Sequence, residues 1–279
     1  MADIVRVNVD QPYDVVVGDG VIESVATRLR PGTTRVAILF APTVSRQAHQ
    51  LGNSLSQNVT YVELPDTESA KTYSTLEMCW DALGAATFTR SDAIISVGGG
   101  ATTDVAGFVA ASWLRGIDVI HVPTTLLAMV DAAAGGKTGI NTPAGKNLVG
   151  AFHHPLAVFC DTSFLQTLPV EDLRAGFGEI IKCGFIQDAT ILADIDAHGD
   201  RLVNADHPLL PSLITRSIKV KADVVADDFK ESASEGLGRE ILNYGHTLGH
   251  AIELVNGYSW RHGEAISVGM VFAAELAHR

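Results

Sequence analysis

Three separated motifs supply the side chains that proteins use to bind a catalytic zinc ion. Glu179 lies in the run GEIIK, His246 and His250 lie in NYGHTLGH, and His262 lies in WRHGE. One carboxylate and two imidazoles are the usual protein donors of a catalytic zinc, and they leave positions open for a substrate oxygen. His246 and His250 stand at i and i+4 and would share one helix face, so helix geometry alone allows both to be ligands.

The alternative is that each histidine only caps a helix or lies on its surface, and the spacing alone does not decide between the two readings. Glycine stands next to His246, His250 and His262. Because glycine lets crowded helices approach closely, this favours the metal.

A second candidate site lies between Ala93 and Phe152, where glycines and lysines follow predicted strands. The run AIISV predicts a buried strand, GGGATTD a turn, and the residues through Trp113 a helix. Such a helix start offers unpaired N–H groups to a phosphate, and the glycines let the backbone come close to it. A second strand, Val119 to Val122, precedes the runs PTT, GGKT and GKN. Together they favour a surface for a large phosphorylated ligand.

Common nucleotide motifs do not explain these runs. GGKT resembles the end of a Walker A loop, but Asp131 stands where that motif needs glycine, so we exclude an NTPase. GGG is not G-x-G-x-x-G, and alone it indicates no more than a tight turn. Lys182 stands three residues after Glu179 and could be only its helical ion-pair partner, and Lys219 and Lys221 could be a solvated face.

Composition narrows the class of protein. The chain has 279 residues, of which 47% are hydrophobic, which fits two domains better than one. Its apolar runs are too short for a membrane span and its start lacks a signal-peptide pattern, so we expect a cytoplasmic protein. The three cysteines, an odd number in apolar surroundings, are expected to be reduced core thiols. The net charge of −12 argues against nucleic acid as a partner.

The elements that must position these motifs change in character along the chain. Strands and helices alternate up to Thr167, which predicts a mostly parallel sheet with ligands at its carboxyl edge. The expected strands are 4–9, 13–17, 35–40, 59–64, 93–97 and 119–122, and the expected helices are 21–29, 44–55, 74–86 and 105–113. Only helices are expected afterwards, over 171–187, 209–225, 236–255 and 262–279. The prediction is an α/β dinucleotide-binding domain, 1–167, followed by an all-α metal- and substrate-binding domain, 168–279, with the active site in the cleft between them.

Taken together, the motifs from Asp66 to Glu264 resemble those of 3-dehydroquinate synthase, in the same order. The resemblance implies a phosphate-eliminating lyase of the shikimate pathway, which leads to chorismate and the aromatic amino acids. It would use NAD and Zn²⁺ or Co²⁺ to convert 3-deoxy-D-arabino-heptulosonate 7-phosphate into 3-dehydroquinate. A secondary alcohol is transiently oxidised, phosphate is eliminated, the hydride returns, and an aldol step closes the ring. A homodimer is also implied.

The same resemblance implies a role for individual residues. The metal ligands would be Glu179, His246 and His262, which leaves His250 to face the substrate. The substrate pocket would contain Arg115, Asp131, Lys137, Asn147, Lys182, Lys221, Arg239, Asn243 and His250. NAD would contact Asp66, Glu68, Lys71, Gly99, Gly100, Ala101, Thr102, Thr103, Asp104, Thr124, Thr125, Lys137, Lys146, Phe164, Leu165, Gln166 and Thr167.

The chain departs from the family pattern in two places. The segment from Asp228 to Arg239 is longer than the corresponding link, which bears on Lys221 and Arg239. The chain also stops at Arg279, where the resemblance implies further helices and another lysine, so the apolar face of Val268, Val271 and Phe272 would be uncovered. Three alternatives therefore stay open: another sugar-phosphate cyclase, a metal-dependent polyol dehydrogenase, and a truncated form that binds NAD without turnover.

Overall fold

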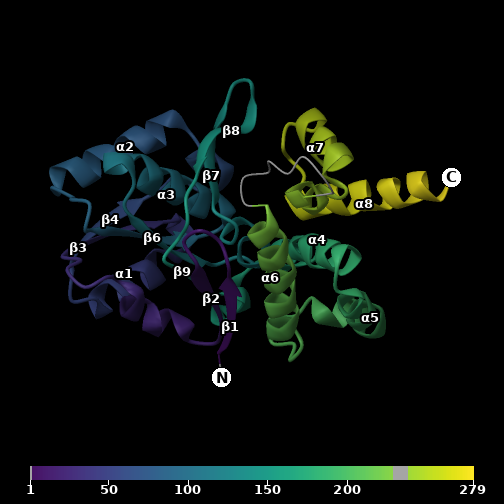
Figure 1. Cartoon of the computed structure of the whole chain (residues 1–279). Helices are drawn as coiled ribbons and strands as arrows, with labels where there is room; N and C mark the ends of the chain where they lie inside the picture. The colour runs from purple at the N-terminus through teal and green to yellow at the C-terminus, as the bar shows by residue number, and fades with distance from the viewer. Residues whose placement is uncertain (1, 229–237) are drawn as a thin grey trace.

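The fold is built on a seven-stranded sheet with the strand order β1-β2-β9-β6-β5-β3-β4 (Figure 1). The computed structural model describes residues 2–228 and 238–279. β1 pairs antiparallel with β2, and the other neighbours in this sheet pair in parallel. A separate antiparallel hairpin is formed by β7 and β8. The strands are β1 Asp3–Val7, β2 Tyr13–Gly18, β3 Arg35–Phe40, β4 Asn58–Glu63, β5 Ala93–Gly98, β6 Asp118–Pro123, β7 Lys137–Thr142, β8 Gly145–Phe152 and β9 Ala157–Asp161.

Helices follow most of the parallel strands and make up the chain after β9. The α-helices are α1 Ser45–Ser54, α2 Tyr73–Ala85, α3 Gly100–Ser112, α4 Val170–Ile186, α5 Ala189–His198, α6 Leu210–Asp227, α7 His246–Val255 and α8 His262–His278. Short 3-10 segments are η1 Val21–Arg28, η2 Pro42–Val44, η3 Thr67–Ala70, η4 Trp113–Arg115, η6 Thr162–Thr167, η7 Gly199–Leu202 and η8 Gly238–Asn243, and η5 Ala128–Ala132 is a π-helical turn.

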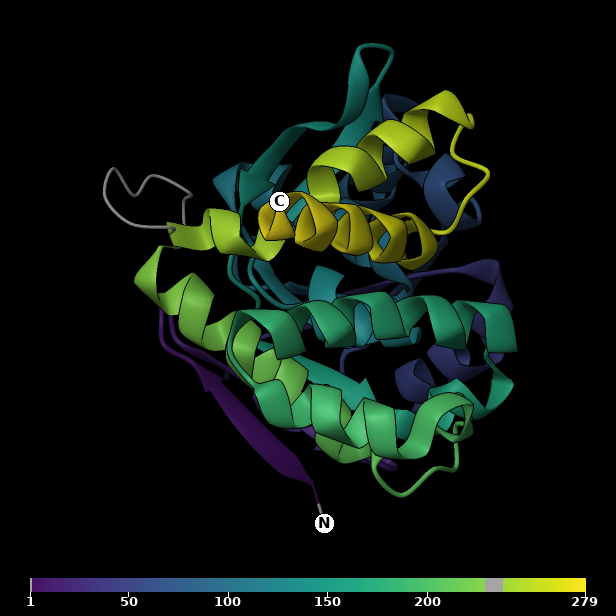
Figure 2. The same ribbon diagram turned by 90° about the vertical axis from the view of Figure 1, so that its right-hand side faces the viewer.

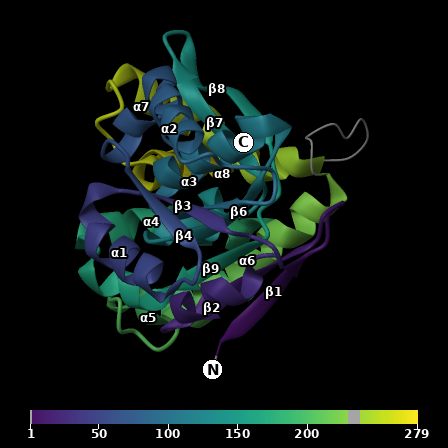
Figure 3. The same cartoon turned by 90° about the vertical axis from the view of Figure 1, so that its left-hand side faces the viewer.

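Both faces of the sheet are buried, as parallel strands require. Along β3, Val36, Ile38 and Phe40 belong to one hydrophobic cluster, and Ala37 and Leu39 belong to another. The second cluster is covered by α2 and α3, while the first is covered by α1 and by α4 and α6 of the helical half. The views in Figures 1 and 3 show α2 and α3 on one side of the sheet and α1 on the other. The predicted fold class, a mainly parallel α/β half followed by helices, is confirmed.

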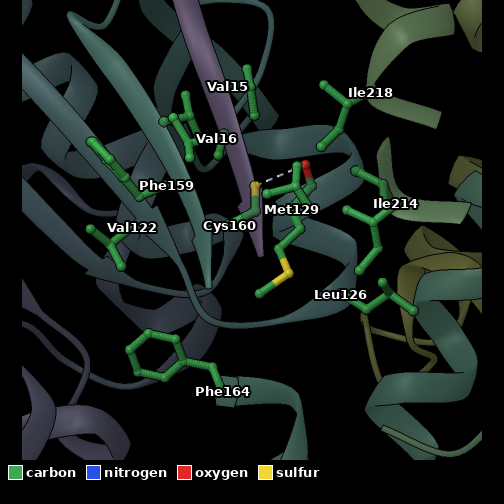
Figure 4. Close-up of a cluster of buried hydrophobic side chains, with 14 of the residues drawn as sticks. Val15, Val16, Val122, Leu126, Met129, Phe159, Cys160, Phe164, Ile214 and Ile218 are labelled. Carbon is green, nitrogen blue, oxygen red and sulfur yellow. Dashed lines mark hydrogen bonds between the residues drawn. The ribbon is translucent and has the colours of Figure 1, made fainter. Parts of the chain in front are cut away.

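The first cluster continues from the sheet into the helical half. Figure 4 shows Cys160 of β9 beside Met129, with Phe159 of β9 on one side and Ile214 and Ile218 of α6 on the other. The Cys160 thiol donates a hydrogen bond to the Met129 carbonyl oxygen at 3.9 Å. Cys79, Cys160 and Cys183 are free and buried, in agreement with the expectation of core thiols.

Most predicted elements are present, but three expectations need correction. The expected helix over 236–255 is interrupted, because η8 ends at Asn243 and Gly245 adopts a left-handed φ of 80° before α7 begins. Residues 229–237, which include the first two residues of this expected helix and most of the long link before Arg239, lie outside the described residues. The helix expected over 21–29 is the 3-10 segment η1. The hairpin β7–β8, the strand β9 and the helix α5 were not predicted.

In the helical half, α6 packs against β1 and β2, α4 packs against α6, and α8 packs against α4. In Figure 2, α8 lies below α7. Val268, Val271 and Phe272 on α8 are exposed, as expected. In the described part of the chain, no helix combines the length and apolar character of a membrane span.

Candidate active site

Three helices bring one carboxylate and two imidazoles to a single point. Glu179 lies in the middle of α4, His246 is the first residue of α7, and His262 is the first residue of α8. The Glu179 Oε1 atom is 3.6 Å from His246 Nε2 and 3.5 Å from His262 Nε2. Among the described residues, this buried oxygen has no hydrogen-bond partner. An orphaned carboxylate oxygen facing two imidazole nitrogens fits a divalent metal ion bound by all three side chains.

Glycines make this approach of helices possible. A Cβ atom on Gly263 would overlap the Ala175 carbonyl of α4, and a Cβ on Gly178 would lie 2.7 Å from the Gly263 carbonyl oxygen. At the next crossing, a Cβ on Gly269 of α8 would overlap the carbonyl of Gly245. The glycines beside the histidines therefore serve the close contact that the sequence indicated.

Buried cations balance the carboxylates around this point. Lys182 forms an ion pair with Glu179 Oε2, and both side chains are almost fully buried. Burial alone would raise the pKa of Glu179, but the Lys182 ammonium group beside it holds that pKa below its usual value. Glu179 is therefore a carboxylate at neutral pH, as a metal ligand must be.

The two histidines near Glu179 differ in their titration. Burial lowers the pKa of His246 to about 4. Burial acts in the same direction on His262, but the carboxylates of Glu179 and Glu253 outweigh it and raise its pKa to about 9. His250 is exposed on α7, with its ring centroid 5.2 Å from that of His246 and 5.9 Å from that of His262. It is not part of the cluster of Glu179, His246 and His262, but it forms a second group of possible metal donors with Glu253 and His262.

A second charged pair lies directly beside this cluster. Lys221 of α6 donates to the Asp131 carbonyl oxygen at 2.6 Å and forms an ion pair with its carboxylate. Burial alone would raise the pKa of Asp131, but Lys221 and Lys182 hold it well below its usual range. Arg239 is also buried, and it lies close to Lys221. A Cβ added to Gly135 would be 2.8 Å from the Arg239 guanidinium and 3.2 Å from Lys221 Cε. Cations predicted for the substrate are thus grouped around Asp131.

The glycine run forms the start of α3 at the carboxyl edge of the sheet. Gly99 is the N-cap of α3, so the first amides of the helix point out of the run GGGATT. Thr124 and Thr125 follow the neighbouring strand β6, and the Thr124 amide donates to the Gly98 carbonyl at 2.9 Å. A Cβ on Gly100 would lie 3.1 Å from Ala132, which shows how closely η5 approaches this helix end. This arrangement can bind a phosphate or pyrophosphate.

Lys71 connects the helix start to the hairpin. Its ammonium group is 2.6 Å from Asp104 Oδ2 and also contacts Asn147 Oδ1. Burial raises the pKa of Asp104 to about 6 against the opposing effect of Lys71. Lys146, next to Asn147 on β8, lies 3.7 Å from Glu68 Oε1 and 3.3 Å from Glu253 Oε1. Residues predicted to contact the cofactor thus lie together where the β7–β8 hairpin packs beside η3.

The remaining predicted residues lie at various distances from this centre. Lys137 is exposed at the start of β7, and Asn243 is exposed at the end of η8. Arg115 ends η4 at the far end of α3, about 20 Å along the helix from Gly100 at 1.5 Å per residue. Arg115 is thus separated from the N-terminus of α3 by the length of that helix.

A cavity of about 500 Å³ lies between η1, α1 and η6. Its lining includes Phe164 and Thr167, which belong to the run predicted to contact NAD, together with Gln47 and Gln50 of α1. The cavity is at the carboxyl edge of the sheet, where β3 and β9 end, and not at the three metal donors. It is therefore separate from the cluster of Glu179, His246 and His262.

Two side chains near the centre were missed by the sequence reasoning. Glu253 contacts both Lys146 and His262, and Asn141 holds Glu68 through a 3.2 Å hydrogen bond. The only available signal for Glu253 was its place on α7, seven residues after His246 and hence on the same face. No signal pointed to Asn141, because the hairpin that carries it was not predicted.

Residues 61–279 match two consecutive family models. Residues 61–175 match the model described as 3-dehydroquinate synthase N-terminal, and residues 176–279 match the model described as 3-dehydroquinate synthase C-terminal. The chain is 52% identical over 273 residues to the 3-dehydroquinate synthase of Paenarthrobacter aurescens, covering 97% of this chain and 74% of that protein. It is 52% identical over 275 residues to that of Mycolicibacterium vanbaalenii, covering 98% and 75%.

Solved structures of related cyclases have the same fold. A 2-deoxy-scyllo-inosose synthase complexed with carbaglucose-6-phosphate, NAD⁺ and Co²⁺ matches with a TM-score of 0.87 and 32% identity, covering 99% of this chain and 76% of that one. ValA, a 2-epi-5-epi-valiolone synthase from Streptomyces hygroscopicus with NAD⁺ and Zn²⁺ bound, matches with a TM-score of 0.84 and 28% identity, covering 92% and 72%. A probable glycerol dehydrogenase from Sinorhizobium meliloti shares only the fold, with a TM-score of 0.68 and 17% identity over 94% of this chain and 76% of that one.

Proposed function

Because this chain belongs to the 3-dehydroquinate synthase family, we propose that it converts 3-deoxy-D-arabino-heptulosonate 7-phosphate into 3-dehydroquinate and phosphate. The enzyme is a phosphate-eliminating, ring-closing lyase that depends on NAD and a divalent metal. The observation that carries the assignment to this site is the unpartnered Glu179 Oε1, which faces two imidazole nitrogens next to a phosphate-binding helix start.

We assign the metal to Glu179, His246 and His262. When bound, NAD accepts and returns a hydride, and the metal polarises the reacting substrate oxygen. Glu179 is held as a carboxylate by Lys182, and His246 stays neutral because it is buried, so both can donate electron pairs at neutral pH. His250, exposed beside them, is free to bind a substrate oxygen.

The substrate carries a carboxylate and a phosphate, so its site must supply local positive charge. The whole chain has a net charge of −12, and only a local group of cations can attract such an anion. We assign this role to Lys182, Lys221 and Arg239 around Asp131, with Lys137, Asn147 and Asn243 at the rim. Held cations orient the phosphate for departure and stabilise the charge that develops on it. Arg115 stays in the assignment by family resemblance alone.

We assign the cofactor to the carboxyl edge of the sheet. The N-terminal amides of α3, from Gly99 to Asp104, would bind the pyrophosphate, with Thr124 and Thr125 beside them. Asp66, Glu68, Lys71 and Lys146 would contact the ribose and nicotinamide parts. The cavity lined by Phe164 and Thr167 would receive the other end of the molecule, next to Leu165 and Gln166.

The test is phosphate release from the heptulosonate 7-phosphate, with NAD and zinc added and then after chelation. Release that the chelator abolishes, without accumulation of NADH, supports the proposal. The matched variants are Glu179→Gln, which keeps the shape of the ligand, and Glu171→Gln, which removes an exposed carboxylate from the first turn of the same helix. NAD binding with no phosphate release would refute the proposed reaction.

A second candidate is a cyclase for a sugar phosphate that lacks the carboxylate. It is favoured by the likeness to 2-deoxy-scyllo-inosose synthase, whose solved complex holds carbaglucose-6-phosphate. Offering a hexose 6-phosphate in the same assay separates the two reactions. Release from the hexose phosphate and not from the heptulosonate would support this second reading.

Three broader features complete the proposal. We place a domain boundary at Thr167, with 1–167 binding NAD and 168–279 binding metal and substrate, since the last strand ends at Asp161 and α4 begins at Val170. A homodimer is proposed because β1 is an edge strand with an exposed Ile4, and sedimentation velocity would test it. The free, buried thiols are consistent with a cytoplasmic location.

A further inference from the structure

Glu253 lies between a proposed metal ligand and a proposed cofactor lysine. It is on α7, with 3% of its surface exposed, and each of its carboxylate oxygens has its own partner. Oε2 is 3.3 Å from His262 Nδ1, and Oε1 is 3.3 Å from Lys146 Nζ. Glu253 is neither one of the three proposed metal ligands nor one of the proposed cofactor contacts.

The contact with His262 determines which ring nitrogen faces the metal donors. An ionised carboxylate can only accept, so Nδ1 of His262 must carry the proton that it donates to Glu253. The other nitrogen, Nε2, points to Glu179 Oε1 at 3.5 Å, so it is the nitrogen that gives up its proton when a metal binds beside Glu179. Carboxylates that hold a ligating histidine in this way fix both its tautomer and its orientation.

The contact with Lys146 reaches the other half of the molecule. Lys146 is on β8, its Nζ is 3.7 Å from Glu68 Oε1, and the same ammonium group lies 4.1 Å from the centre of the Tyr258 ring. Glu68 and Lys146 belong to the α/β half, and Glu253, Tyr258 and His262 belong to the helical half. Glu253 is thus a direct bridge between the residues proposed for NAD and those proposed for the metal.

We propose that Glu253 is a positioning residue that holds His262 Nε2 toward the metal and Lys146 toward the cofactor, and so couples the binding of the two. The inference rests on the proposed metal and NAD sites. A ligand that orders Lys146 also orders Glu253 and His262, so NAD tightens the binding of zinc. Linkage requires that zinc tightens the binding of NAD by the same factor.

The experiment measures zinc affinity, which needs no turnover. Metal-free wild-type protein, Glu253→Gln and Glu253→Ala compete for zinc with a chromophoric chelator, with and without NAD. Glutamine keeps the shape of the side chain but removes the negative charge that pairs with Lys146. Its amide can also donate a hydrogen bond, so it no longer forces the proton of His262 onto Nδ1. Both substitutions should weaken zinc binding about 10- to 100-fold, which is the usual effect of losing such a partner. In the wild type NAD should strengthen zinc binding by roughly fivefold or more, and in both variants this gain should disappear.

Glu264→Gln is the matched control. Glu264 is also a carboxylate close in sequence to His262, but it contacts the Arg261 amide and guanidinium. Its removal should leave zinc affinity and the effect of NAD unchanged. The visible spectrum of cobalt-loaded Glu253→Gln should also differ from that of the wild type, because the His262 ring is no longer held.

The outcomes separate this inference from the proposed function. Wild-type zinc affinity in a folded Glu253→Gln overturns the positioning role while leaving the metal site intact. An equal loss in Glu264→Gln also overturns it, because the effect would then be one of general charge. A wild-type protein that does not bind zinc refutes the metal site itself. Circular dichroism and the thermal midpoint of each variant show that folded proteins are being compared.

Discussion

Lys182 and Glu179 form a buried ion pair whose balance depends on what else is bound. Removing one partner of such a pair costs about 3–5 kcal/mol, because the remaining charge is left buried and uncompensated. Lys182→Met should therefore lower the free energy of unfolding of the metal-free protein by this amount. Added zinc should restore much of the loss, since the metal supplies a positive charge beside Glu179.

Urea unfolding with and without zinc measures both effects. Lys219→Met is the control, because Lys219 is exposed on α6 and its loss should change neither curve. A loss of stability in Lys182→Met that zinc leaves untouched would mean that no metal reaches Glu179.

His121 is a buried histidine outside the site, and its titration should be visible in the stability of the fold. It lies on β6, where its Nδ1 is 2.8 Å from Ser96 Oγ of β5. Burial, with a smaller effect of His153, lowers its pKa from 6.5 to about 3. Between these two pH values the unfolded chain binds a proton that the folded chain does not.

Stability must then fall as the pH drops below 6.5, and each such histidine adds a slope of up to about 1.4 kcal/mol per pH unit. His121→Asn keeps a hydrogen-bonding group near Ser96 but removes the titrating ring. Its unfolding free energy should therefore decline less steeply than that of the wild type between pH 6.5 and pH 5. Parallel slopes in urea titrations at several pH values would show that His121 is protonated in the folded state.

At the scale of elements, apolar strands and amphipathic helices could be predicted, while elements defined by contacts could not. β3 was predicted with its observed bounds because Arg35 to Phe40 is a short apolar run between polar segments. The strands β7 and β8 were missed, because β8 is largely exposed and shows no apolar alternation. The break before α7 at Gly245 was missed because its cause is a tertiary contact. Gly245 packs closely against Gly269 and Met270 of α8, a contact that local sequence does not indicate.

The candidate site shows the same division. The residue types and glycine neighbours indicated Glu179, His246 and His262, and the structure brings these three together. The position of His250 beside the cluster could not be predicted from the spacing, because residues at i and i+4 share a helix face and both histidines could therefore have been metal ligands. The helix spacing placed Glu253 on the face of His246, but its contact with Lys146, 107 residues away, could not be predicted from the sequence.

The crossing of α4 and α8 is the element-scale feature that holds the metal donors together. Gly263→Ala would place a methyl group against the Ala175 carbonyl, so α8 must move away from α4. Overpacking of this kind costs about 1–3 kcal/mol. The movement would also draw His262 away from Glu179, so zinc affinity should fall together with stability.

Gly84→Ala is the control for this substitution. Gly84 lies in the last turn of α2, where an added Cβ meets only Trp113 at 3.6 Å, an ordinary contact distance. Alanine there should raise the free energy of unfolding by about 0.5–1 kcal/mol and leave zinc affinity unchanged. Zinc titration and urea unfolding of both variants test the pair. Normal zinc binding by Gly263→Ala would mean that the crossing does not set the donor geometry.

At the scale of the whole molecule, function divides between two halves that share a core. The α/β half supplies the helix start, Lys71 and Asp131, and the helical half supplies the metal donors and Lys221. One hydrophobic cluster runs from β2 and β9 through Met129 to Ile214 and Ile218 of α6 (Figure 4). Contacts such as Lys221 with Asp131 and Glu253 with Lys146 cross between the halves at the site itself. The two halves should therefore unfold together.

Ile218→Ala tests this cooperativity. Ile218 is fully buried in the shared cluster, and truncating such a side chain costs about 2–5 kcal/mol. Trp260 lies between α7 and α8, whereas Trp80 and Trp113 lie in the α/β half, so tryptophan fluorescence can report on each half separately. Two backgrounds are needed: one in which Trp260 is replaced by Phe, and one in which Trp80 and Trp113 are replaced by Phe. Ile218→Ala should lower the urea midpoint by the same amount in both, because a two-state protein has one transition. If only the Trp260 signal moved to lower urea, the helical half would be unfolding by itself, and the shared core would not be what holds the metal donors against the cofactor edge.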